Sequence, residues 1–181
     1  MTDVISTERL VLRPWTPDDA EAALAVFGDA SVARWLTPAM SAPADVEQMR
    51  EHLERWAAEQ AGLETPRGRW AVERAADGVV VGGMELRPLP PYDEDIEIGW
   101  QLAPGHWGQG YATEAARAVA QYAFSEAVEE VFAVVRPSNE RATAVARRLG
   151  MEWVGETDKY YGLVLQVYRL RPSDLAETPA A

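Results

Sequence analysis

The chain has 181 residues, of which 48% are hydrophobic and 25% charged, and its 29 acidic and 17 basic side chains give a net charge of −12. This composition is typical of a folded globular protein and excludes a disordered chain. The sequence contains no cysteine, which excludes disulfides, thiolate metal sites and a cysteine nucleophile.

The charge and the ends of the chain bear on partners and location. Nucleic acid requires clustered basic residues, so an acidic chain argues against it and favours cationic partners such as amines. The sequence contains no run of 18 apolar residues, so no membrane-spanning helix is expected. The N-terminal residues MTDVISTERL do not resemble a signal peptide. We therefore expect a cytoplasmic protein that does not bind membranes.

The N-terminal part predicts one strand and two helices. Alternating polar and apolar residues predict a strand over residues 8–15. Thr16, followed by Pro17 and two aspartates, is typical of a helix start, and Gly28 would end that helix. A second helix is expected over 44–59, and the residues 60–69 are rich in loop formers.

The middle of the chain predicts three strands. The first two, 70–74 and 78–86, are separated by Asp77-Gly78, a pair typical of a hairpin turn. After a polar, proline-rich connection, the third strand covers 95–102. Its apolar residues alternate with Glu97, Gly99 and Gln101, which are expected on the opposite face.

The C-terminal part continues with alternating helices and strands. A glycine-bearing loop precedes a helix over 112–129, which carries an apolar stripe at helical spacing, and a β-branched strand follows at 131–135. Ser138 is expected to cap a last helix that Gly150 ends. Strands over 152–156 and 163–170 close an α/β domain.

We expect a single domain over residues 1–172 and a flexible tail over 173–181. The expected order of elements is β-α-α-β-β-β-α-β-α-β-β. No internal repeat or linker interrupts this order.

The loop between the strand 95–102 and the next helix is a candidate anion site. Its glycines, Gly105, Gly108 and Gly110, can turn backbone N–H groups towards a phosphate at the helix N-terminus. A nucleotide-hydrolase loop, GxxxxGK[ST], is absent, and Gly108-Gln109-Gly110 lacks the third glycine of a dinucleotide fingerprint. A tight turn with no ligand is the alternative.

The residues around this loop indicate a family. HWGQGYATEA, after the strand DIEIGWQL, resembles motif A of the GNAT superfamily of N-acetyltransferases, whose loop reads (Arg/Gln)-x-x-Gly-x-(Gly/Ala). Trp107 departs from the Arg/Gln of that pattern, but a tryptophan followed by GxGYATEA is similar to the ribosomal-protein (RimJ/RimL-like) branch. TERLVLRPWTPDDAEA, FGDASVARWL, VVVGGMEL and RPSNERATAVARRLGMEWVGE resemble that branch in the same order, over residues 7–172.

This resemblance implies a GNAT fold, which is a mixed, mostly antiparallel sheet flanked by helices. Its parallel strands, here 95–102 and 131–135, splay apart and hold the pantetheine arm of acetyl-CoA. Backbone groups of the first strand would pair with that arm, loop N–H groups would bind the pyrophosphate, and Asn139 would bond to the arm or only cap its own helix. The residues that the resemblance assigns to acetyl-CoA are Gln101, Leu102, Ala103, Trp107, Gly108, Gln109, Gly110, Tyr111, Ala112, Thr113 and Asn139.

The chemistry of amide formation directs attention to carboxylates. An amine must lose a proton before or during its attack on a thioester, which costs roughly 1 kcal/mol for an α-amine and about 5 kcal/mol for a lysine at pH 7. Glu97 is the candidate base because it lies on the strand that leads to the acetyl site and off its apolar face. Asp95 and Glu85 are lesser candidates. The alternative is that Glu97 is only a surface glutamate.

The general acid is less clear, because the family positions for a serine or a tyrosine on the last helix hold Ala142 and Ala146. Tyr160 and Tyr161 are the remaining candidates to protonate the leaving sulfur, and we take Tyr161 as the catalytic one. Both could equally be packed aromatics.

The sequence therefore predicts an acetyl-CoA-dependent N-acetyltransferase that acts on a primary amine in a ternary complex. The acceptor would be a protein N-terminus or a small-molecule amine, and the enzyme a monomer or homodimer. A non-catalytic acyl-CoA-binding module and a nucleotide-binding protein are the alternatives. No metal site is expected, since the two histidines, His52 and His106, have no third ligand beside them. Four tryptophans are candidates for the core or for the acceptor wall: Trp15, Trp35, Trp56 and Trp70.

Overall fold

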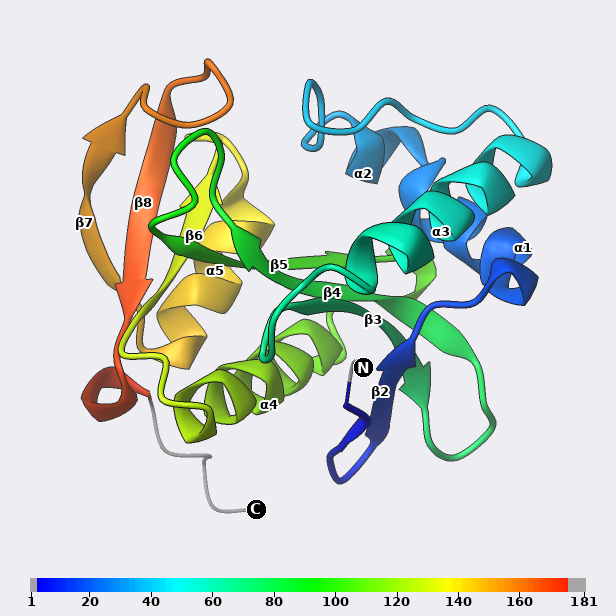
Figure 1. The fold of residues 1–181 in the computed structure, drawn as a ribbon, viewed down its shortest axis with the longest axis horizontal. Helices are drawn as coiled ribbons and strands as arrows, with labels where there is room; N and C mark the ends of the chain where they lie inside the picture. The colour runs from blue at the N-terminus through cyan, green and yellow to red at the C-terminus, as the bar shows by residue number, and fades with distance from the viewer. Residues whose placement is uncertain (1–2, 176–181) are drawn as a thin grey trace.

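The computed structural model describes residues 3–175, so most of the expected tail lies outside the described residues (Figure 1). The strands are β1 (Ile5–Ser6), β2 (Leu10–Pro14), β3 (Gly68–Arg74), β4 (Val80–Pro88), β5 (Ile96–Leu102), β6 (Val131–Val135), β7 (Glu152–Thr157) and β8 (Leu165–Leu170). The helices are α1 (Ala20–Phe27), α2 (Ala30–Ala33), α3 (Val46–Gln60), α4 (Tyr111–Ser125) and α5 (Glu140–Leu149). Short 3-10 turns occupy Pro17–Asp19, Pro104–His106 and Pro172–Asp174.

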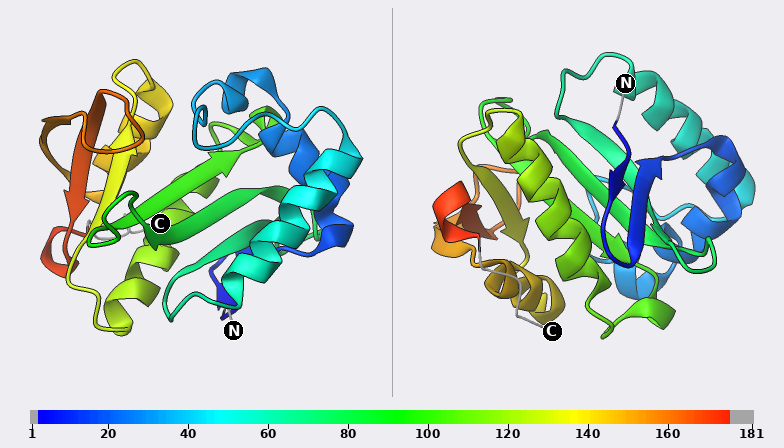
Figure 2. Two further views of the ribbon diagram at one scale, coloured as in Figure 1. Left: turned by 45° about the horizontal axis from the view of Figure 1, so that its top comes forward. Right: turned by 90° about the horizontal axis from the view of Figure 1, so that it is seen from below.

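The described strands form one mixed sheet in the order β1-β2-β3-β4-β5-β6-β8-β7. All neighbouring pairs are antiparallel except β5 and β6, which run parallel. That pair has a single registered contact, Glu97 with Phe132, whereas β4 and β5 are paired along the whole of β5. The two parallel strands therefore separate beyond Glu97, as Figure 2 shows for β5 in green and β6 in yellow. The expected GNAT fold is confirmed.

Helices cover both faces of the sheet (Figures 1 and 2). On one face, α4 and α5 bury small and aliphatic side chains against β2–β6, with Ile98 and Leu102 of β5 in that core. On the other face, α1 and α3 pack around Trp15 and Phe27. The alternation predicted for β5 is thereby confirmed, because Glu97 and Gly99 are left on the face opposite α4.

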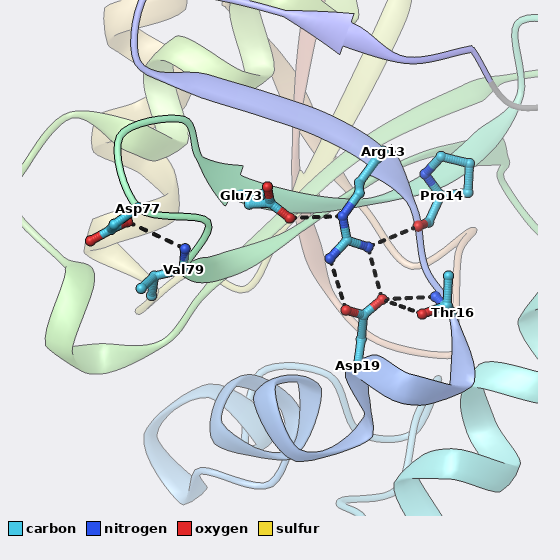
Figure 3. A network of polar contacts seen from close by, with 7 residues as sticks. All are labelled: Arg13, Pro14, Thr16, Asp19, Glu73, Asp77 and Val79. Carbon is cyan, nitrogen blue, oxygen red and sulfur yellow. Dashed lines mark hydrogen bonds and ion pairs between the residues drawn. The ribbon is translucent and has the colours of Figure 1, made fainter.

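Arg13 fixes the turn that leads from β2 into α1 (Figure 3). Its guanidinium donates two parallel hydrogen bonds to Asp19, at 2.8 and 2.9 Å, and a third to Glu73 on β3 at 2.8 Å. Asp19 also accepts from the backbone N–H of Thr16. This charge-assisted network joins two strands to the first helix and so sets where α1 and the segment after it lie.

The long helix α4 is shorter than its sequence predicts. The expected apolar stripe is buried, but the helix ends at Ser125 instead of 129. Ala127 has a φ of 64°, and the N–H of Val128 donates to the carbonyl of Ala123, which closes the last turn in the manner of a left-handed cap. Glycine usually occupies that position, and its absence here removed the sequence signal.

Three smaller predictions are corrected. The cap of α5 is Asn139, whose Oδ1 accepts from the N–H of Ala142 at 3.3 Å, and Ser138 lies before it. The hairpin at Asp77-Gly78 is present, with Gly78 at a φ of 72°, but β3 begins two residues earlier and β4 two residues later than expected. The short strand β1 was not predicted, because two residues show no period.

Gly82 on β4 allows the close approach of β4 and β5. A Cβ there would lie 2.2 Å from the carbonyl oxygen of Gln101, which is backbone and cannot rotate away. We expect Gly82→Ala to lower the free energy of unfolding by about 1–3 kcal/mol, measured by urea denaturation. Gly62→Ala is the matched control, because the nearest atom there is 3.6 Å away. Equal stability of the two variants would contradict the close packing.

Candidate active site

A cavity of about 1680 Å³ lies where β5 and β6 separate. It is lined by the last residues of both strands, by the N-terminal turns of α4 and α5, and by the segment 31–39 that includes the end of α2. Tyr161, from the connection between β7 and β8, completes the wall. The cavity therefore reaches residues on both faces of the sheet through the gap between the parallel strands.

The glycine loop presents the N-terminus of α4 to this cavity. Gly108 and Gly110 have φ values of 75° and 80°, a conformation that favours glycine, and Gly110 is the N-cap of α4 without a side chain to cover it. The first N–H groups of a helix have no acceptor within the helix. Arg9 holds the loop through the carbonyl of Gln109 (3.0 Å) and the carboxylate of Glu114 (2.7 Å). This geometry suits a bound phosphate.

Three basic residues that sequence reasoning missed contribute positive charge to this cavity. Arg117, Arg141 and Arg148 all line the cavity, in a chain whose net charge is −12. The spacing of Arg141 and Arg148 was a usable signal, because seven residues place both on one face of a helix. The local positive charge fits a pyrophosphate or phosphate group.

Trp107 links the loop to β5 in place of the Arg/Gln of the family pattern. Its indole Nε1 donates to the carbonyl of Leu102 at 3.0 Å, and the guanidinium of Arg141 lies 3.7 Å from its ring centroid. The departure from the pattern therefore builds a stacked contact between the loop and α5.

The backbone of β5 offers fewer free groups than expected. The N–H of Ala103 donates to the carbonyl of Val81 at 3.0 Å, and in an antiparallel pair the residue two positions away, Gln101, turns its backbone to the same neighbour. Leu102 and Trp100 therefore face the gap beside β6. Ala103 and Gln109 do not line the cavity, whereas the other expected residues do: Gln101, Leu102, Trp107, Gly108, Gly110, Tyr111, Ala112, Thr113 and Asn139.

Glu97 and Tyr161 meet in the wall of the cavity. The hydroxyl of Tyr161 donates to Oε2 of Glu97 at 2.6 Å, across 64 residues of sequence. The pKa of Glu97 is raised from 4.5 to about 7: burial is the largest cause, the negative charge of Glu85 adds to it, and Tyr161 and Arg87 oppose it. Burial and the charge of Glu97 raise the pKa of Tyr161, so the phenol stays protonated. A carboxylate with a pKa near neutrality is suited to accept a proton at cellular pH.

The other sequence candidates lie in different surroundings. Glu85 lines the cavity next to Arg87, whereas Asp95 lies outside it and pairs with Lys159 at 3.3 Å. Tyr160 donates its hydroxyl to Asp95 and is buried away from the cavity. Ala142 lines the cavity at the family's serine position, and Ala146 is fully buried.

The segment 31–39 gives the cavity an aromatic and aliphatic wall. Of the four candidate tryptophans, Trp35 lines the cavity beside Leu36, while Trp15 and Trp70 are buried in the core and Trp56 packs against it. Arg136, at the end of β6, donates to the carbonyl of Thr37 and so closes this side. Within residues 3–175 no three His, Asp or Glu side chains gather as metal ligands would, and no described helix is long and apolar enough to cross a membrane.

A sheet that splits beside a glycine-capped helix N-terminus, with a carboxylate of raised pKa in the split, is the arrangement expected from the resemblance to the GNAT acetyltransferases. The chain belongs to the GNAT acetyltransferases: the family described as "Acetyltransferase (GNAT) domain" matches residues 9–152. It is an acetyltransferase enzyme, and GNAT acetyltransferases use acetyl-CoA.

Individual relatives agree with this assignment. The chain is 29% identical over 164 residues to the uncharacterized N-acetyltransferase YoaA of Bacillus subtilis (strain 168), covering 88% of this chain and 89% of that protein. An acetyltransferase structure from Agrobacterium tumefaciens str. C58 matches with a TM-score of 0.75 and 25% identity over 94% of this chain and 95% of that one. The ribosomal-protein-S5-alanine acetyltransferase of Vibrio fischeri has the same fold, with a TM-score of 0.75, 16% identity and coverage of 97% and 100%.

Proposed function

We propose that this enzyme transfers the acetyl group of acetyl-CoA to a primary amine by direct attack within a ternary complex. The observation that supports the proposal is the continuous cavity, which joins a helix N-terminus suited to a phosphate to Glu97. The acceptor is a protein N-terminal α-amine or a small-molecule amine. The lower cost of deprotonating an α-amine favours that class over a lysine side chain.

Different residues of the cavity bind different parts of acetyl-CoA. The N–H groups of Gly108–Thr113 and the arginines of α4 and α5 hold the pyrophosphate. Leu102 and Asn139 contact the pantetheine arm, which lies along β5 like an added strand. Asn139 keeps its capping bond to Ala142 in the described structure, so its amide N–H₂ is the group available to the arm.

The residues at the split carry the chemistry. Acetyl-CoA supplies a thioester whose sulfur leaves as a weakly basic thiolate, with a pKa of ~8.5. Glu97, directly or through one water, accepts a proton from the acceptor's ammonium group. Tyr161 keeps Glu97 oriented, and because its own proton is directed at Glu97 we assign it this positioning role ahead of that of general acid. Loss of an acid slows such a reaction by ~10²–10⁴-fold without preventing it, so the alanines at 142 and 146 are compatible with catalysis.

The experiment that tests the donor is thermal unfolding with acetyl-CoA, with ATP and NADPH as controls. A ligand that binds only the folded state adds about 2.7 kcal/mol at 100 times its Kd, which raises Tm by several degrees at this size. We expect a rise with acetyl-CoA alone. An equal rise with ATP or NADPH, or none at millimolar acetyl-CoA, would contradict the proposal.

Turnover is then measured with a panel of α-amines, lysine analogues and polyamines. Since the chain has no cysteine, a thiol-reactive dye reports only the CoA that the reaction releases. Release that depends on the amine shows transfer, whereas binding without release from any amine would identify a non-catalytic acyl-CoA-binding module.

A further inference from the structure

A row of alternating charges crosses the sheet face that carries Glu97. Arg69 on β3 is opposite Glu85 on β4, and Arg87 on β4 is opposite Glu97 on β5. Residues opposite each other, or two apart on one strand, share a face, so all four side chains lie on the face away from α4. With Glu59 of α3, whose carboxylate lies 2.7 Å from Arg69, these residues form what we call the charged row (Glu59, Arg69, Glu85, Arg87 and Glu97).

The two oxygens of Glu85 have different surroundings. Oε2 lies 3.0 Å from Nε of Arg87 and 3.6 Å from Nε of Arg69, so this oxygen pairs with two guanidinium groups. Oε1 lies over Gly99 on β5, where a Cβ would be 2.9 Å from it. Gly99 thus provides the space in which one oxygen of Glu85 reaches across β5 to the cavity. Glu85, Gly99 and Glu97 all line that cavity.

The charged row is one positive charge short. It contains three carboxylates and two guanidinium groups, so it is balanced either when Glu97 holds a proton or when a cation joins it. The charged and titratable groups that act on Glu97 are Glu85 and Arg87 from β4 and Tyr161 from the β7–β8 connection. Tyr161 stays neutral, so Glu85 is the negatively charged group among these three neighbours of Glu97.

We propose that Glu85 and Glu97 together form the seat of the acceptor's ammonium group, which supplies the missing positive charge, and that the amine therefore binds as its cation. This inference rests on the proposed function, because it assigns the amine to the same site. The N–H₃⁺ group lies between Oε1 of Glu85 and the carboxylate of Glu97. One proton passes from nitrogen to Glu97, the freed lone pair forms the C–N bond to the acetyl carbon, and the C–S bond breaks. The second nitrogen proton neutralises the thiolate, and Glu97 returns its proton to solvent.

Proton and cation compete for the same place, and this gives a test that needs neither acetyl-CoA nor turnover. The side-chain carboxyl of Glu97 is titrated by carbon-13 NMR in glutamate-labelled protein, with propylammonium chloride and with sodium chloride at the same ionic strength. We expect propylammonium, but not sodium, to lower the pH midpoint of Glu97, because an adjacent cation favours the carboxylate. An equal response to both salts would overturn the proposal.

Two variants separate the role of the charge of Glu85 from that of its position, and a third serves as the control. Glu85→Gln removes the charge, so we expect a midpoint about one pH unit lower without amine and no further response to propylammonium. Gly99→Ala keeps the charge but displaces the flexible end of Glu85, and is expected to weaken the response to propylammonium at least several-fold. Glu94→Gln, in the exposed connection before β5 and outside the charged row, is the control and retains the response. If propylammonium still lowers the midpoint in Glu85→Gln, Glu85 is not part of the seat.

Kinetics with any accepted amine provide a second readout. We expect Glu85→Gln to raise KM for the amine at least tenfold, with KM for acetyl-CoA unchanged, and an unchanged KM for the amine would overturn the assignment. Failure of acetyl-CoA to bind would remove the proposed function but not a propylammonium response, so the two failures are distinguishable.

Discussion

Glu97→Gln is expected to slow acetyl transfer by about 10²–10⁴-fold, the usual contribution of a general base. Glutamine keeps the shape of the side chain and an oxygen that accepts from Tyr161, so the cavity and the binding of acetyl-CoA are retained. In the wild-type enzyme, kcat/KM for the amine is expected to rise with pH up to about 7, because Glu97 with a pKa of about 7 accepts a proton only when ionised. Glu97→Gln is expected to lack this rise of kcat/KM with pH, the acid limb of the pH profile.

Stability gives an independent check on the same substitution. The pKa of Glu97 is higher in the folded chain than its ordinary value of 4.5, so the folded state binds more protons between pH 4.5 and 7 and loses stability as pH rises through that window. Glu97→Gln has no such loss. We expect it to be more stable than wild type at pH 8, by about 1–3 kcal/mol, and similar at pH 4.5.

The control is Glu94→Gln, three residues away in the exposed connection before β5. It is expected to change neither rate nor the pH profile. A Glu97→Gln enzyme with wild-type turnover and an intact acid limb would remove Glu97 from the mechanism and leave the base to another group.

The second large effect is expected at the loop glycines. An alanine in the left-handed conformation costs about 1–2 kcal/mol, so the free loop of Gly108→Ala or Gly110→Ala relaxes and turns N–H groups away from the cavity. Each substitution is then expected to weaken acetyl-CoA binding by about 5- to 30-fold. If the two strains add, we expect the double variant to bind acetyl-CoA about 30- to 1000-fold more weakly than wild type, as measured by calorimetric titration.

Gly105→Ala tests whether conformation is the cause. Gly105 lies in the same loop, but its φ is not positive and a Cβ there would meet nothing within 4 Å. We expect wild-type affinity from this variant. Lower stability with unchanged affinity in Gly108→Ala or Gly110→Ala would show that the strain is borne by the fold and not by the binding site.

Much of the fold could be predicted from the sequence because its long elements carry clear periods. The apolar stripe of α4, the alternation of β5 and the five β-branched and apolar residues of β6 each indicated a face as well as a type of element. The end of α4 could not be predicted, because Ala127 takes a conformation that glycine usually marks. The cap of α5 was misplaced by one residue, since Ser138 and Asn139 are both good caps and only the backbone geometry selects between them.

Part of the candidate site could also be predicted from the sequence, for a related reason. The glycine loop and Glu97 stand in one continuous stretch, so the local pattern and the family resemblance could identify them together. Tyr161, Glu85 and the arginines of α5 reach the cavity from separate elements, and their neighbours depend on strand order. The bond between Tyr161 and Glu97 and the position of Glu85 over Gly99 are therefore properties of the sheet register, which a pattern in one segment does not contain.

The gap between β5 and β6 also has a consequence for the order of events. The sheet acts as a partition, with the helix terminus that suits the donor on the α4 side and the wall of Trp35 and Leu36 on the other. Under the proposed function, we expect the donor and the acceptor to meet at the opening between the parallel strands. For the proposed transfer we therefore expect that neither has to pass through the other's binding surface, so that either can enter first and either product can leave first.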